Sequence, residues 1–263
     1  MSTEVASLET AIAESNGGGN GNEVTVQHVK TAGLERVVLA QGVKQPSKEK
    51  LERYLGILDS YAVQLQERIE TDIQKADQEL RQSQKRGVKA EMGEPYSTAY
   101  KWWDIFALGP IQGLSLPPYG PHKIFAGGEP TIFFVFVVTN PMPLMAGPSA
   151  TTVMAGKPYK LRLTTMNVTS VNAGPSLEID SVFPGTPVQG FLFIMNQPTP
   201  AQGRPEIVEF NVTADVSSGF SQPMAAFATN IIDVDFDPGF PAGVAQGPHI
   251  HVEQPMRCLC YNP

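Results

Sequence analysis

The chain has 263 residues, a formal net charge of −7 and a sequence pI of about 5.1. This acidic balance argues against nucleic acids and anionic membranes as main partners, because both are negatively charged. The length suits one large domain or two modest ones. The first residues lack the basic start and apolar core of a signal peptide, and the longest apolar run, 132–138, is too short to span a bilayer. We therefore expect a protein of the cytoplasm or of a particle assembled inside the cell.

Residues 1–22 form the first predicted segment, a disordered head. It ends in a run of glycine and asparagine, 16–22, that cannot build a packed core. Residues 23–45 then predict a β-hairpin or arm, with strands near 24–29 and 34–39 and a turn between them. A lone hairpin is marginally stable in water. It must therefore lie on the β domain of its own chain or, as an exchanged arm, on that of a neighbour.

Residues 46–87 predict one long helix. Pro46 and Ser47 are typical of a helix start, and Gly87 is typical of the residue that follows a helix. A narrow, heptad-like apolar seam runs along it, formed by Leu51, Leu55, Leu58, Ala62, Leu65, Ile69 and Ile73. The seam either packs along a β domain of the same chain or forms a coiled coil between chains. Its narrow width over several turns favours the coiled coil, so we take these seven residues as candidate oligomerisation residues.

Residues 88–121 predict an aromatic and Pro-rich connector. Tyr96, Tyr100, Trp103 and Ala107 fall at helical spacing, which allows a short second helix with an aromatic face. The alternative, which we favour, is that Trp102 and Trp103 fill the core between helix and sheet.

From residue 122 to residue 263 the chain predicts a succession of strands separated by Gly/Pro clusters. In the stretch 206–216, Val208, Phe210 and Val212 alternate with polar residues, as expected of a half-buried strand. Helical stretches do not alternate with these strands, so a parallel βαβ sheet is not expected. The predicted fold class is α+β, with the long helix followed by an antiparallel β-sandwich or jelly-roll-like domain.

Charge is scarce in the second part of the chain. Residues 101–263 contain 7 Lys and Arg and 11 Asp and Glu, a charged fraction of about 11% against the usual value of about 25%. Burial of weakly charged β surfaces against other subunits would explain this composition, and a secreted adhesin is the alternative with a similar composition.

The residues most able to bind a divalent metal lie near the end of the chain. His249, His251 and Glu253 alternate, so a strand would place them on one face, where imidazole and carboxylate suit transition metals. The three carboxylates of 233–237 also alternate, so a strand would place them on one face. Hard cations prefer such clusters of oxygen ligands. An outward-facing strand shows the same alternation without binding anything, and this simpler interpretation is favoured.

Cys258 and Cys260 are the only cysteines, so no disulfide framework is expected. Two thiols two residues apart on a strand face the same way and could ligate a soft metal or oxidise. We favour the alternative that they are reduced and packed near the terminus.

No nucleophile elbow, P-loop or dinucleotide-binding motif is present. The sequence thus favours a non-enzymatic structural subunit that associates with itself, and with other assembly subunits, through its helix and weakly charged β surface into a shell, filament or virion-like component. The first alternative is a metal-binding protein or metal-dependent enzyme that uses His249, His251 and Glu253. The second is a ligand-binding β domain that docks on a larger complex through its helix. No other cofactor is expected.

Overall fold

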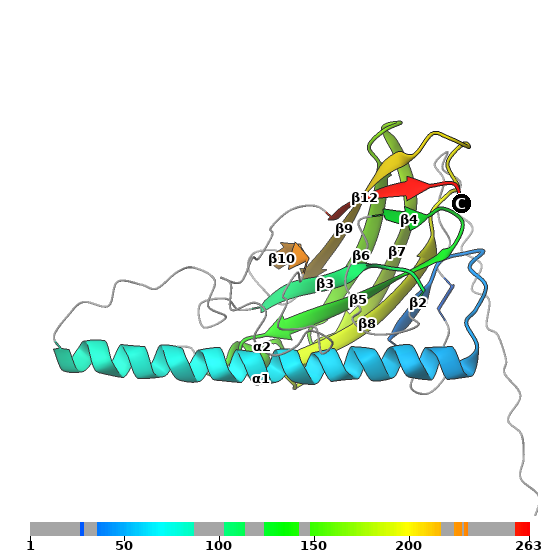
Figure 1. Cartoon of the computed structure of the whole chain (residues 1–263). Helices are drawn as coiled ribbons and strands as arrows, with labels where there is room; N and C mark the ends of the chain where they lie inside the picture. The colour runs from blue at the N-terminus through cyan, green and yellow to red at the C-terminus, as the bar shows by residue number, and fades with distance from the viewer. Residues whose placement is uncertain are drawn as a thin grey trace, which may run out of the picture.

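The computed structural model describes residues 27–28, 36–86, 103–113, 124–141, 148–216, 224–227, 229–230 and 256–263. In this part of the chain, two β-sheets pack face to face and helix α1 (Lys48–Arg86) lies across the outer face of one of them (Figure 1). A short helix, α2 (Ala150–Met154), is capped by Ser149, whose side chain accepts a hydrogen bond from the Thr152 amide. The molecule is an α+β protein in which β structure dominates.

Sheet A has the strand order β1-β2-β8-β5-β3-β11. Its strands are β1 (Gln27–His28), β2 (Val37–Leu39), β3 (Trp103–Ile111), β5 (Pro130–Thr139), β8 (Val188–Asn196) and β11 (Thr229–Asn230). β1 pairs antiparallel with β2, as the predicted hairpin requires, and β2 pairs with β8 of the same chain. Residues from the predicted arm and from the predicted connector therefore both contribute strands to the sandwich.

Sheet B has the strand order β4-β12-β9-β6-β7, with β10 also paired to β9. Its strands are β4 (Ile124–Ala126), β6 (Pro158–Asn167), β7 (Asn172–Val182), β9 (Glu206–Val216), β10 (Met224–Phe227) and β12 (Met256–Tyr261). Side chains of sheet A and sheet B interdigitate in a core that includes Phe133, Tyr159, Phe193 and Phe210.

The prediction of purely antiparallel sheets is wrong. β2 with β8, β4 with β12 and β3 with β11 are parallel pairs, so both sheets are mixed. The lack of alternating helices excludes only parallel strands that are joined by a local crossover. Each of these three pairs instead joins segments more than a hundred residues apart in the sequence, where no crossover helix is needed.

The short helix that the spacing around Trp103 allowed is not formed, because Trp103 and Ala107 belong to β3. Trp103 is buried, and its ring meets Phe183 edge-on with centroids 5.5 Å apart. It therefore fills the core between the two sheets and not a space between helix and sheet, whereas Trp102 lies outside the described residues.

β5 explains where α1 lies. Phe133, Val135 and Val137 face sheet B, while the alternate residues Phe134 and Phe136 face α1. Both faces of this strand are covered, so its sequence is a continuous apolar run. Strands β6 and β9, whose outer face is not covered by α1, alternate instead between buried and partly exposed residues.

Candidate functional site

The predicted helix seam packs on sheet A as far as Ile69. Leu51, Leu58, Leu65 and Ile69 are buried in a cluster with Phe134, Phe136, Leu192 and Ile194 of sheet A, and Leu55 and Ala62 pack at its edge. Tyr61 joins this cluster, its ring centroid 6.3 Å from that of Phe134. The side chain of Ile73, the last predicted oligomerisation residue, lies outside the described part. Most of the seam is thus occupied within its own chain.

The remainder of α1 extends past the sandwich (Figure 1). We call residues 70–86 the helix extension; from Ile69 to Arg86 it measures about 25 Å at 1.5 Å per residue. Positions 73, 76 and 80 fall on the same side of the helix as Ile69, because they follow it by about one, two and three turns. All three positions are apolar in the sequence, as Ile73, Ala76 and Leu80. Apolar positions therefore continue in the sequence beyond Ile69, the last seam residue whose side chain the structure buries on sheet A.

The predicted metal ligands His249, His251 and Glu253, and the carboxylates of 233–237, lie outside the described residues. Within the described part of the chain, no group of three or more His, Cys, Asp or Glu side chains is placed to hold a metal ion. The metal-site hypothesis stays a prediction from the sequence.

Cys258 and Cys260 lie side by side on β12 and point into the core between the sheets, where both are buried and free. Burial raises the pKa of the Cys258 thiol to about 12. Burial, together with the nearby charge of Glu206, raises that of Cys260 to about 11. Neither thiol is an effective nucleophile or metal ligand near neutral pH, because both functions require the thiolate.

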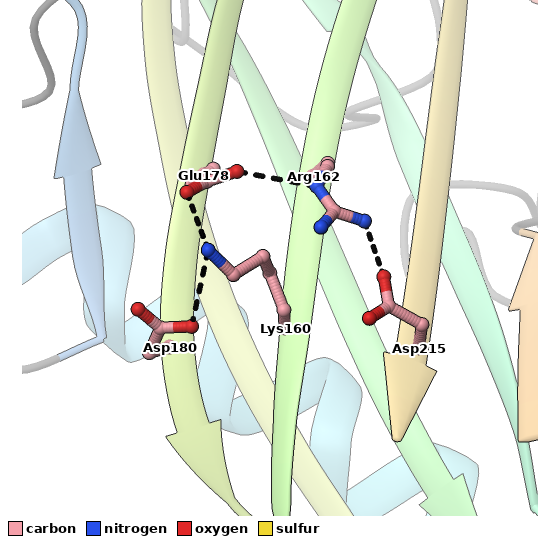
Figure 2. Close-up of polar contacts among 5 residues, drawn as sticks. All are labelled: Lys160, Arg162, Glu178, Asp180 and Asp215. Carbon is pink, nitrogen blue, oxygen red and sulfur yellow. Dashed lines mark hydrogen bonds and ion pairs between the residues drawn. The ribbon is translucent and has the colours of Figure 1, made fainter. Parts of the chain in front are cut away.

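The outer face of sheet B carries a ladder of ion pairs across three strands (Figure 2). Lys160 on β6 binds Glu178 at 2.6 Å and Asp180 at 3.5 Å, both on β7. Arg162, two residues further along β6, binds Glu178 at 3.2 Å and also pairs with Asp215 on β9. The ladder forms because the register places these outward-facing residues beside one another.

These contacts shift the ionisation of the ladder. The hydrogen bond from Lys160, assisted by Arg162, lowers the pKa of the Glu178 carboxyl. Outside the ladder, on β9, the hydrogen bonds from Asn211 and Arg257 lower the pKa of the Glu209 carboxyl. All charges in the ladder have partners, so the ladder offers neither a free base nor a free acid for catalysis. It keeps the middle of this face charged and solvated.

One end of the same face is apolar instead. Leu259 on β12 lies directly between Ile124 on β4 and Ile207 on β9 in the register. Ile124 is 59% exposed, Ile207 44% and Tyr261 40%. We call Ile124, Ile207, Leu259 and Tyr261 the end patch. A shallow pocket of about 350 Å³ opens within it, with Arg204 as the charged residue of its lining.

The end patch was missed from the sequence, although a signal for it exists. Val208 and Phe210 face the core, so Ile207 occupies an outward position where a polar residue is expected. Leu259 likewise lies between the two inward-facing cysteines. Apolar residues in the outward register of two neighbouring strands indicate a contact surface.

A second pocket, of about 430 Å³, lies between the start of α1 and the end of sheet A. Ile132 and Ile194 line it together with Lys44, Lys50 and Tyr54. The described lining of these two pockets contains neither histidine nor cysteine.

No protein-family model matches the chain, and no curated protein matches it. Among the described residues, none of the helices combines the length and apolar character needed to cross a bilayer.

Proposed function

We propose that this protein is a non-enzymatic structural subunit that associates with itself into a homo-oligomer or a larger assembly such as a shell or filament. The observation that carries the proposal is the helix extension, whose apolar positions continue beyond the sheet that buries the rest of the seam. In proteins, most of the stability of a helix comes from the packing of its apolar side. A second copy of the chain supplies that packing.

Two further features support self-association. Residues 101–263 carry few charges for a surface that faces only water. The end patch adds an exposed apolar area on the face of sheet B that α1 leaves open. A coiled coil between copies and a jelly-roll-like shell subunit are the finer forms of this proposal. A coiled coil would use the helix beyond Ile69, since the seam before that point is buried on sheet A.

The experiment is native mass spectrometry of the full-length protein at micromolar concentration, combined with light scattering. We expect species at integer multiples of the 28.4 kDa chain mass and no additional metal mass. A monomer at all concentrations would refute self-association. One divalent metal per chain would instead favour the metal-binding alternative, to be tested by replacing His249 and His251.

A further inference from the structure

We propose that two copies of this chain pair through the end of sheet B that carries the end patch, with a hairpin tip of each copy seated in the pocket of the other. This inference rests on the proposed self-association and names a surface and a symmetry for it. The contact uses the outer face of sheet B, which α1 leaves open because α1 packs on sheet A (Figure 1).

An apolar row crosses this end of sheet B from β4 to the turn between β6 and β7. Leu259 of β12 lies between Ile124 of β4 and Ile207 of β9 in the register. The Val168 amide donates a hydrogen bond to the Ile207 carbonyl, which brings the turn to the same level, and Val171 closes the turn opposite Val168. We call these five residues the end row. It is about 19 Å long, since neighbouring strands lie about 4.8 Å apart.

One end of the end row is a fixed, projecting tip. Val171 is 72% exposed, and its backbone φ of 57° is one that a β-branched residue rarely adopts. Hydrogen bonds hold the turn in place: the Thr169 hydroxyl accepts from the Ile207 amide, and the Asn167 side chain accepts from the Ser170 amide. The surrounding structure thus keeps an apolar side chain in an exposed and strained position, and strain of this kind is concentrated at functional contacts.

The other end of the end row is hollow. The pocket of about 350 Å³ opens there beside Ile124, Leu259 and Tyr261, with Arg204 in its lining. This volume is ample for the side chain of a valine. The end row itself contains no charged residue, so it selects a partner by shape. A tip at one end and a hollow at the other make the row complementary to a second copy of itself.

A two-fold axis parallel to the strands, through the middle of the end row, brings tip and hollow together. Ile207 is the middle residue, so it meets Ile207 of the second copy, while Val171 of each copy meets the Ile124 end of the other. The two Arg204 side chains then lie at opposite ends of the contact. They are separated by roughly the 19 Å length of the row, well beyond the screening length of about 8 Å at physiological ionic strength.

The exposed apolar area matches what a specific dimer requires. Val171 is 72% exposed, Ile124 59%, Ile207 44%, and Tyr261 and Met166, which border the row, 40% each. At about 200 Å² for a large residue, these five expose on the order of 500 Å² in each copy. Two copies would bury on the order of 1,000 Å², which is where specific interfaces begin. An apolar patch of this size is also near the upper end for a protein that faces only water.

Two full-length variants each remove one half of the contact. Val171→Asn replaces the tip, and because asparagine tolerates this φ better than valine, the melting temperature should not fall. Ile124→Asn replaces the wall of the pocket. We expect the dissociation constant, measured by analytical ultracentrifugation, to rise about tenfold or more in each variant. The matched control is Val182→Asn, at a 53% exposed position at the far end of β7, and it should associate as the wild type does.

Engineered cysteines test the symmetry. A mixture of Val171→Cys and Ile124→Cys chains should form a disulfide-linked dimer under mild oxidation, whereas Val171→Cys alone should not, because the two tips lie about 19 Å apart. Ile207→Cys alone should crosslink with itself, since it lies on the axis. A chain that carries both Val171→Cys and Ile124→Cys should stop at a covalent dimer, with twice the chain mass of 28.4 kDa. The native Cys258 and Cys260 are buried, so the wild type should form no crosslink.

Other outcomes overturn the inference in distinguishable ways. A series of larger covalent species from the double cysteine variant indicates a head-to-tail contact, and self-crosslinking of Val171→Cys indicates that two tips meet. If Val171→Asn and Ile124→Asn both associate as the wild type does, the copies meet through another surface, and the inference fails while the proposed function stands. A wild-type protein that stays monomeric refutes both.

Discussion

Leu58 offers the sharpest test of how α1 is held. Its side chain is fully buried and lies on Gly190 of β8. A Cβ at position 190 would stand 3.0 Å from both Cγ and Cδ1 of Leu58, so the glycine is what allows the helix to approach the sheet this closely. Leu58→Ala therefore leaves a cavity over a residue that has no side chain to fill it.

The expected cost follows from that geometry. Buried leucine-to-alanine changes destabilise by about 2–5 kcal/mol, and the cost is larger where the surroundings collapse less. We expect Leu58→Ala to lower the free energy of unfolding by about 3–5 kcal/mol, measured by urea denaturation with circular dichroism. Leu55→Ala, at a half-buried position on the same helix, is the control and should cost clearly less.

The same measurement distinguishes packing within the chain from packing between chains. Because Leu58 contacts sheet A of its own chain, the loss of stability should be the same at all protein concentrations. A leucine in a coiled coil between chains would instead make the difference depend on concentration. A loss below about 1 kcal/mol, or one that grows on dilution, would refute the packing described for α1.

Two predictions concern ionisable groups. The pKa of Glu178 is lowered in the folded state, so its stabilising contribution is present above the ordinary value of 4.5 and is lost as the pH falls below it. The melting temperature of the wild type should therefore fall at acid pH, and Glu178→Gln should make this fall smaller. A fall of unchanged size would contradict the role of the ladder. Cys258 and Cys260 should resist a thiol reagent at pH 8 in the native protein and react fully in urea, since burial keeps both protonated; rapid native labelling would show that β12 opens.

The order and type of the main elements follow from local sequence patterns. Ser47 begins α1 because its backbone carbonyl accepts from the Leu51 amide and its hydroxyl lies 3.4 Å from the Lys50 amide. The alternation in β9 and the continuous apolar run in β5 also distinguish a half-covered strand from a strand covered on both faces. With that distinction, the sequence alone indicates that something packs on the outer face of the sheet that contains β5.

Tertiary structure decided which surfaces meet. An apolar seam such as that of Leu51, Leu58 and Leu65 requires burial, but its spacing is the same whether the partner is a sheet or another helix. The parallel pairing of β2 with β8 and the ladder from Lys160 to Asp215 join residues that are distant in the sequence. The end patch depends on the alignment of β4, β12 and β9, which only the register of the folded sheet determines. Local patterns determine which residues need a partner, and the long-range pairing of the strands determines which partner they have.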